Sequence, residues 1–339
     1  MDIPDKTRAV VLPAYNPNFI RALLGLKTRE IALPPLTPGK VAVRIEATTC
    51  NPSDIAFMQG GYNIVKPLPA VPGFEGTGVV IAATDGYKHF EGRRVAVFSQ
   101  DDNSGCWAEI LVTGVENCIP LKSGISLEQA AAFAINPLTA YGMFLMAVEK
   151  GSQTIVLNAA GGRVPAFIRA LAARKGMEVI NIFRKKNSAE RIENTDNQSF
   201  LFTNDNDFED KLIELLKTKT NVTAFDAVGG DHTGMLFNAL PGNSQVVVYG
   251  GLSNKPVSGI DTLGLIFKNK TVTGFNLNDF IAKHRKDGDL QTIAEELQDL
   301  IIAGTIHTDI QAVLPLDDIV KGIRTYIKDM SAGKVIFKP

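Results

Sequence analysis

The segment from residue 154 to residue 186 has the layout of a nucleotide-binding β-α-β unit. Its first residues, Thr154–Leu157, are apolar and partly β-branched, which predicts a buried parallel strand. A turn of small residues follows, then apolar residues at helical spacing from Val164, and a second strand is predicted over Glu178–Phe183. Such a turn directs backbone N–H groups and the positive end of the helix dipole toward one place, which suits a pyrophosphate.

The glycine pattern of this turn departs from the usual Gly-x-Gly-x-x-Gly fingerprint. Gly161 and Gly162 are present, but Arg163 and Pro165 stand where further glycines are expected. Pro165 is tolerated in the first helical turn, where its missing N–H would have no partner. Arg163 could pair with a phosphate or fill the site. Two interpretations stay open: a dinucleotide site, or a plain strand-to-helix turn that binds nothing.

Basic residues follow the second strand. Arg184, Lys185 and Lys186 occupy the place where an NAD-selective site has a carboxylate for the ribose hydroxyls. A basic cluster there suits the 2′-phosphate of NADPH, although a solvated loop would have the same composition. Because of the position, we expect NADPH as the cofactor.

Strand patterns alternate with helical patterns after residue 126 and predict a doubly wound sheet of six parallel strands. The six patterns cover residues 154–159, 178–183, 199–203, 224–228, 245–250 and 270–275. Before residue 120, short strands are broken by Gly and Pro, which is typical of a small antiparallel, barrel-like domain. The closing strand, 334–339, has no partner pattern in the parallel series. We therefore expect a first domain of residues 1–125 completed by 277–339, and a second domain of residues 126–276.

Composition and charge exclude several classes of protein. The 339 residues are 45% hydrophobic, enough for two domains with their own cores. A formal net charge of −1 argues against binding to nucleic acid or to an anionic membrane. Cys50, Cys106 and Cys118 form neither a disulfide framework nor a metal motif, which fits a reducing compartment. With no presequence pattern and no long apolar run, we expect a soluble cytoplasmic protein.

Several motifs along nearly the whole chain resemble one enzyme superfamily. They begin with TTCNPSDIAFMQGGYNIVKPLPAVPGFEGTGVV (48–80) and AAAFAINPLTAYGMF (130–144) and continue with FDAVGG, VVVYGG and SAGKVIF. This series resembles the zinc-free branch of the medium-chain dehydrogenase/reductase superfamily, which contains quinone oxidoreductases and trans-2-enoyl thioester reductases. The resemblance implies a GroES-like β-barrel-type catalytic domain, a Rossmann domain and a small-molecule substrate. It also implies a homodimer joined along the last parallel strand, 270–275.

The residues at the zinc-ligand positions of this superfamily predict a site without metal. Those positions hold Asn51, Phe74 and Ile135, none of which supplies a thiolate or an imidazole. The four-Cys structural zinc loop is also missing, and the four His residues lack ligand spacing. Reduction would then depend on a proton donor and on hydrogen bonds to the substrate carbonyl.

Tyr62, at the end of the motif QGGY, is the main catalytic candidate. The resemblance implies that hydride passes from NADPH to Cβ while this tyrosine, directly or through water, helps protonate Cα or binds the thioester carbonyl. A phenol suits that role because it is a neutral donor near pH 7. The alternative is a loop tyrosine packed on the surface of the lobe.

Asn51 is the second catalytic candidate. Its amide is expected to donate to the substrate or to the cofactor ribose, and the alternative is an Asx-turn before Pro52. Asp54 and Glu75 are expected to be structural and to hold the loop through hydrogen bonds.

Other residues are expected to bind the cofactor. They are Asn136 and Thr139 in the linker, Gly161, Gly162 and Arg163 in the turn, Arg184 and Lys185, Gly250 and Gly251 at the end of the fifth strand, Phe275, and Lys334. We expect an NADPH-dependent reductase of an activated C=C bond, with an enoyl thioester as substrate. An NADPH:quinone or enone oxidoreductase stays open, as does a non-catalytic relative whose altered turn impairs cofactor binding.

Overall fold

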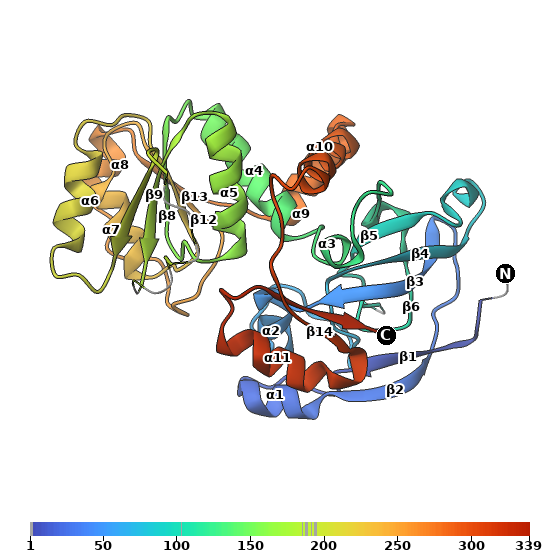
Figure 1. The fold of residues 1–339 in the computed structure, drawn as a ribbon. Helices are drawn as coiled ribbons and strands as arrows, with labels where there is room; N and C mark the ends of the chain where they lie inside the picture. The colour runs from blue at the N-terminus through green and yellow to red at the C-terminus, as the bar shows by residue number, and fades with distance from the viewer. Residues whose placement is uncertain (1–2, 103, 185, 187–188, 191, 193–194) are drawn as a thin grey trace. The chain divides into compact units, whose positions relative to one another are not determined.

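The computed structural model describes residues 3–102, 104–184, 186, 189–190, 192 and 195–339. The chain divides into two compact units, which are Met1–Ile135 with Asp289–Pro339, and Asn136–Gly288 (Figure 1). Both boundaries lie later in the chain than residues 125 and 277, where composition placed them. The reason is packing: helix α3 (Leu127–Ala131) contacts strands of the first unit, and α9 (Leu277–Asp287) contacts a helix of the second.

The first unit is built around a mainly antiparallel sheet. Its strands are β3 Lys40–Thr49, β4 Glu75–Ala83, β5 Arg94–Phe98, β6 Ile110–Gly114, β7 Cys118–Pro120, β14 Ile310–Pro315 and β15 Lys334–Lys338. Their order is β14-β15-β3-β4-β5-β7, with β6 also paired to β3. Strand β15 pairs parallel with β14 and antiparallel with β3, so the end of the chain returns to the first lobe, as its sequence predicts.

Shorter elements complete the first unit around an aromatic core. They are the antiparallel pair β1 (Lys6–Val11) and β2 (Lys27–Ala32), and helices α1 Phe19–Gly25, α2 Pro52–Met58, α10 Leu290–Ile302 and α11 Ile319–Lys328. Phe57, Phe74, Trp107 and Phe337 are fully buried in one hydrophobic cluster. The indole N–H of Trp107 donates to Thr49 O at 3.0 Å, so this buried donor has a partner. The cluster supports the loop between α2 and β4.

The second unit contains the predicted sheet of six parallel strands. These are β8 Thr154–Leu157, β9 Glu178–Phe183, β10 Gln198–Phe202, β11 Thr223–Asp226, β12 Gln245–Val248 and β13 Thr271–Gly274. Their order is β10-β9-β8-β11-β12-β13, which is doubly wound, and β13 lies at one edge. Chain order reverses between β8 and β11. Ligands of open α/β sheets bind beside the carboxyl ends of strands at such a point.

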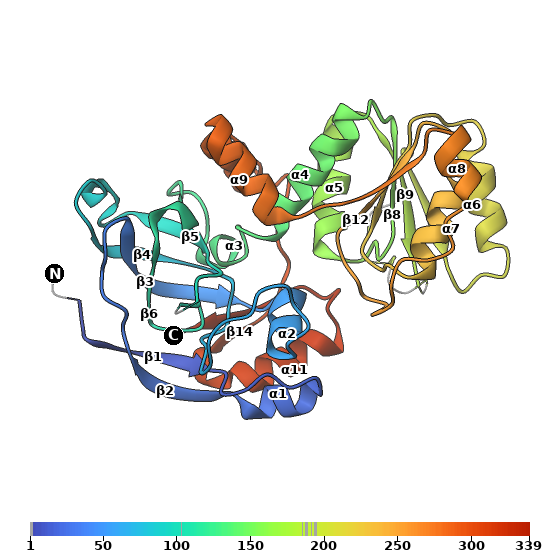
Figure 2. The same ribbon diagram turned by 180° about the vertical axis from the view of Figure 1, so that it is seen from behind.

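Helices cover both faces of this sheet. They are α4 Asn136–Glu149, α5 Arg163–Arg174, α6 Phe208–Leu216, α7 Asp231–Ala239 and α8 Thr262–Phe267, whereas α9 contacts α4. Figures 1 and 2 show α4 and α5 on one face and α6 and α7 on the other. Among the residues that the structure describes, none of the helices combines the length and apolarity needed to cross a bilayer.

Candidate functional site

Asn51, Glu75 and Lys334 meet in the buried interior of the first unit. Asn51 precedes α2, Glu75 begins β4 and Lys334 begins β15, and each side chain is at most 1% exposed. Asn51 Nδ2 donates to Glu75 Oε1 at 2.7 Å. Lys334 Nζ donates to Asn51 Oδ1 and, at 3.2 Å, to Cys50 O. The asparagine amide is therefore oriented from both ends, and it retains a second N–H beyond the one given to Glu75.

Glu75 also links Asn51 to Ile135, two of the positions that were compared with zinc-ligand positions on the basis of the sequence. Its Oε2 accepts the backbone N–H of Ile135 at 2.9 Å, and Phe74 precedes it in the chain. Burial raises the pKa of Glu75 to about 7, against the opposing effects of Lys334 and of the hydrogen bonds from Asn51 and Ile135. In the described part of the chain, no group of three or more His, Cys, Asp or Glu side chains is arranged to hold a metal ion.

Asp54 holds the start of α2 against the loop that precedes β4. Its Oδ2 accepts the N–H of Asn51 at 2.7 Å, and its Oδ1 accepts the N–H of Phe74 at 2.9 Å. Burial raises the pKa of Asp54 to about 6, although these hydrogen bonds and Lys334 oppose the shift. The carboxylate thus fixes the backbone on which Asn51 and Glu75 sit.

Tyr62 lies half-buried in the loop after α2. Its ring centroid is 5.5 Å from that of Phe74, with the planes at 33°. A side-chain hydrogen bond joins it to Gln100, which follows β5. Burial raises the pKa of Tyr62, the Gln100 bond opposes that shift, and Asp54 adds to it. The phenol is therefore held neutral, and its ring packs on the residue next to Glu75.

Lys66 is a buried cation beside the same aromatic rings, and it was not among the residues singled out from the sequence. Its Nζ donates to Ser104 O at 2.6 Å and lies 5.8 Å and 5.5 Å from the ring centroids of Phe57 and Phe74. Burial lowers the pKa of Lys66 to about 8, against the favourable charges of Cys106 and nearby aspartates. A lysine in a proline-containing loop is expected to be exposed to solvent, so the sequence alone does not identify Lys66 as buried.

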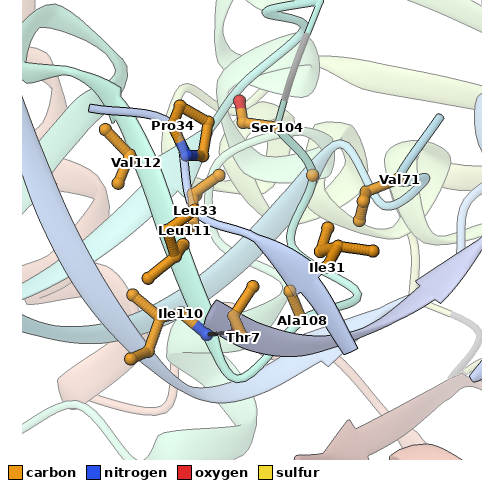
Figure 3. A pocket seen from close by; sticks show the side chains of 11 residues that line it. Thr7, Ile31, Leu33, Pro34, Val71, Ser104, Ala108, Ile110, Leu111 and Val112 are labelled. Carbon is orange, nitrogen blue, oxygen red and sulfur yellow. Dashed lines mark hydrogen bonds between the residues drawn. The ribbon is translucent and has the colours of Figure 1, made fainter. Parts of the chain in front are cut away.

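The first unit also contains a small cavity, and none of the side chains described above lines it. It has a volume of about 10 Å³ and is lined by residues of β1, β2 and β6 with Val71 and Ser104 (Figure 3). A space of this size holds about one water molecule. It is therefore too small for a substrate.

In the second unit, the turn after β8 reaches the start of α5. Gly162 precedes α5, Arg163 is its first residue, and Pro165 falls in the first turn, where the sequence predicts that proline is tolerated. The left-handed conformation falls on Ala159, with φ 44°, and not on either glycine. Gly162 N–H donates to Ala159 O at 2.9 Å, which closes the turn.

Asn158 and Asp226 connect the carboxyl ends of the central strands β8 and β11. Asn158 Nδ2 donates to Asp226 Oδ1, and Asn158 Oδ1 accepts the N–H of Ala227 at 2.7 Å. Asp226 also accepts the backbone N–H groups of Val228 at 2.7 Å and Gly229 at 3.0 Å. These bonds fix both turns at the switch point. Neither residue was a candidate, although each stands directly at a strand end.

Arg169 of α5 hydrogen-bonds the turn between β8 and α5. The sequence alone does not predict this contact. Its guanidinium donates to Ala160 O at 2.7 Å and to Asn181 Oδ1 at 3.2 Å. Burial lowers the pKa of Arg169 to about 10, and the positive charge of Arg163 contributes to that shift. Two guanidinium groups therefore lie near the turn that begins α5.

Comparisons with known proteins find similarity over nearly the whole chain. The alcohol dehydrogenase GroES-like domain matches residues 37–135. Bovine mitochondrial enoyl-[acyl-carrier-protein] reductase is 29% identical over 98% of this chain and 89% of its own. Mouse synaptic vesicle membrane protein VAT-1 homolog-like is 25% identical over 97% and 80%. A Mesorhizobium loti crystal structure, provisionally named an NADPH:quinone reductase, matches with a TM-score of 0.91 and 28% identity over 100% of both chains.

Over nearly its whole length, the chain is similar to enzymes of the medium-chain dehydrogenase/reductase superfamily. The predicted combination of a GroES-like domain with a Rossmann-like sheet is confirmed. Oxidoreductases are found among both the sequence relatives and the structural neighbours, which assigns the chain to that class of enzyme.

Most of the other candidate residues stand at strand or helix ends. Asn136 and Thr139 lie in the first turn of α4 and are largely buried. Phe275 follows β13, and its ring would lie 2.7 Å from a Cβ added at Gly142 of α4. Gly251 and Gly250 follow β12, and a Cβ at Gly250 would meet Ala227 O at 2.7 Å, so this close approach requires glycine.

The basic cluster after β9 and Lys334 lie in different surroundings. Arg184 is exposed at the end of β9, whereas Lys186 lies 3.9 Å from Asp205 and 5.8 Å from the Phe202 ring. Lys185 lies outside the described residues. Lys334, a predicted cofactor-binding residue, donates its ammonium protons to Cys50 O and Asn51 Oδ1.

Proposed function

We propose that this protein is an NADPH-dependent, zinc-independent reductase of an activated C=C bond, with an enoyl thioester as substrate. The observation that carries the proposal is that Glu75 hydrogen-bonds Asn51 and Ile135, two of the positions where metal-dependent relatives place zinc ligands. A carbonyl that is activated without a metal needs hydrogen-bond donors. Tyr62, half-buried against Phe74, is such a donor. The bovine enoyl reductase relative supports the substrate class.

The side chains of the first unit have separate roles in this reaction. When bound, NADPH supplies the hydride that adds to Cβ. Tyr62 donates its hydroxyl proton toward the thioester carbonyl or Cα, directly or through water, and its raised pKa keeps the phenol protonated. Asn51 offers its second amide N–H as a further donor. Glu75 and Lys334 hold that amide in one orientation.

The residues of the second unit fit NADPH. The N-terminus of α5, with Gly162 before it and Arg163 as its first residue, suits a pyrophosphate. Gly250 and Gly251 follow β12, at the carboxyl edge of the sheet where ligands of open α/β sheets bind. The exposure of Arg184 at the end of β9 supports a contact with the 2′-phosphate.

We also propose a homodimer formed through the β13 edge. Apolar side chains of the adjacent helix α8 are exposed, with Leu263, Ile266 and Phe267 at 58%, 62% and 77%. Exposed apolar patches and unpaired strand edges are typical of protein interfaces. We propose that the protein is located in the cytoplasm. The bovine relative is named as mitochondrial, so cell fractionation is needed to distinguish the two locations.

Anaerobic NADPH oxidation with enoyl-CoA chains, simple enones and quinones tests the reaction. Turnover is expected to be fastest with an enoyl thioester. Faster turnover with quinones would favour the alternative suggested by the Mesorhizobium loti neighbour, an NADPH:quinone or enone oxidoreductase. NADPH fluorescence on titration separates both from a non-catalytic relative, because an enzyme of this kind must bind the cofactor at micromolar concentration.

A further inference from the structure

The turn between β8 and α5 contains a strained alanine. Ala159 has φ 44°, a left-handed conformation that a residue other than glycine adopts only at a cost. Its neighbour Ala160 is fully buried and is held on both sides. The N–H of Ala160 donates to Ile182 O of β9 at 3.2 Å, and its carbonyl accepts from Arg169 Nη1 at 2.7 Å. Strained residues persist where their surroundings hold them, and they are concentrated at ligand-binding sites.

Arg169 is itself fixed by the sheet. Its Nη1 donates to Asn181 Oδ1 at 3.2 Å in addition to Ala160 O. Asn181 is fully buried on β9, and its Nδ2 donates to Gln198 Oε1 of β10 at 3.1 Å, so its oxygen is left to face the guanidinium. Both acceptors of Arg169 are neutral oxygens, so these bonds do not cancel its positive charge. Arg169 therefore brings a charge as well as a hydrogen bond to the turn.

The bond from Arg169 sets the direction of the next peptide N–H. The peptide bond between Ala160 and Gly161 is trans, and in a trans peptide the carbonyl and the following N–H point in opposite directions. Because Arg169 holds the Ala160 carbonyl, the Gly161 N–H points away from the guanidinium. This N–H has no hydrogen-bond partner among the residues that the structure describes, whereas the Gly162 N–H closes the turn. The Gly161 N–H is thus a fixed donor that is available to a ligand.

We infer that Arg169 is a positioning residue for the pyrophosphate of the cofactor, because it directs the Gly161 N–H toward the anion and adds positive charge beside it. The turn lies at the carboxyl end of β8 and at the N-terminus of α5, where the helix dipole also favours an anion. Arg163 and Pro165 stand where the usual fingerprint has further glycines. A preset N–H and a nearby charge offer a way to bind pyrophosphate in such a turn. This inference rests on the proposed NADPH-dependent function.

The experiment compares two changes at residue 169 with a control on the same helix. Arg169→Met removes the charge and both hydrogen bonds, whereas Arg169→Lys keeps the charge and a donor. Arg174→Met removes an exposed arginine from the last turn of α5 and should change nothing. Kd is measured for NADPH by fluorescence, and for inorganic pyrophosphate and adenosine 2′-phosphate by calorimetry.

The loss of affinity should be confined to ligands that contain pyrophosphate. Arg169→Met should raise the Kd of NADPH and of inorganic pyrophosphate about tenfold, as expected for one lost charge near an anion. Arg169→Lys should raise both about two- to threefold, because an ammonium lacks the rigid fork of a guanidinium. The Kd of adenosine 2′-phosphate should stay the same in both variants, because this fragment has no pyrophosphate.

Two further readouts separate positioning from a general effect on the fold. With glycine-selective ¹⁵N labelling, the amide proton signal of Gly161 should move downfield when inorganic pyrophosphate is added to the parent protein, and much less in Arg169→Met. The pyrophosphate Kd should also rise less steeply with salt in Arg169→Met, because a charge that salt would screen is missing. Loss of a purely structural contact would lower stability to urea and leave this salt dependence unchanged.

The outcomes separate this inference from the proposed function. If the parent binds NADPH and Arg169→Met binds pyrophosphate with the parent's Kd, the inference is overturned and the function stands. Equal weakening for pyrophosphate and adenosine 2′-phosphate also overturns it, because Arg169 would then act on the whole fold. If the parent binds pyrophosphate through Arg169 but does not bind NADPH, the function fails and the role of Arg169 toward the anion stands. Should Arg169→Met not fold, Arg169→Lys carries the test, and an unchanged pyrophosphate Kd in that variant overturns the inference.

Discussion

Glu75 accepts the side-chain amide of Asn51 at 2.7 Å, and both residues are almost fully buried. The other oxygen of Glu75 accepts the backbone N–H of Ile135 at 2.9 Å. A carboxylate can accept both bonds, whereas an amide side chain would turn its own N–H toward one of the two donors. The two hydrogen bonds therefore depend on the carboxyl group of Glu75. Because its pKa differs from the ordinary value, the free energy of unfolding should depend on pH.

The free energy of unfolding should fall as the pH rises through the range between 4.5 and about 7. The pKa of folded Glu75 lies above its ordinary value, so in this range the folded protein holds a proton that the unfolded chain has released. The change corresponds to roughly 3 kcal/mol at most. Asp54, with a pKa raised to about 6, adds an effect of the same sign at the lower end. Urea unfolding at several pH values measures the slope.

Glu75→Gln should remove most of this slope near neutral pH, and it should leave one donor unpaired at a cost of about 1–3 kcal/mol. Glu30→Gln changes an exposed carboxylate on β2 and should leave the slope as it is. If the slope survives in Glu75→Gln, the pH dependence belongs to Asp54 or to other groups.

The elements that could be predicted from the sequence are those defined by local patterns. The six parallel strands correspond to short strand patterns in the sequence. The pairing of β15 with the first unit was predicted because its strand pattern has no partner in the parallel series. The positive φ at Ala159 could not be predicted, because glycine was the expected residue for that conformation.

A residue of the candidate site could be predicted from the sequence only where its side chain has a suitable chemical property by itself. Tyr62 is a donor wherever it lies, so the sequence could single it out. The partners of Asn51 could not be predicted, since Lys334 reaches it across 283 residues of chain. Gln100 and Lys66 are ordinary loop residues until folding places them against Tyr62 and the rings around Phe74.

Arg184→Ala should reduce the preference for NADPH over NADH about tenfold. A charge-assisted contact to the 2′-phosphate is worth about 1.5 to 3 kcal/mol before the discount for an exposed side chain. Lys186→Ala should have a smaller effect, because Lys186 lies 3.9 Å from Asp205. The ratio of the Kd values for the two cofactors gives the preference. Lys283→Ala, an exposed lysine on α9, is the control, and an unchanged ratio in Arg184→Ala would identify the cluster as a solvated loop.

Phe267→Glu should convert the proposed dimer to a monomer. The side chain is 77% exposed on α8, and a charge there would be buried without a partner if two copies met at this surface. Light scattering after gel filtration gives the mass. Ile213→Glu, on the exposed side of α6 and 52% exposed, should leave association unchanged. A parent protein that is monomeric at micromolar concentration would contradict the dimer.

Tyr62→Phe should lower turnover with an enoyl thioester about a hundredfold, the usual cost of one lost donor in the transition state. Ring packing on Phe74, at 5.5 Å, is kept by the substitution, so NADPH affinity should hardly change. With a quinone the loss should be smaller, because the reduced oxygens can take protons from water. Tyr87→Phe, near the 3₁₀ turn after β4, is the matched control and should keep full turnover. Undiminished enoyl thioester turnover in Tyr62→Phe would rule out the donor role, and an equal loss of NADPH affinity would assign Tyr62 to packing.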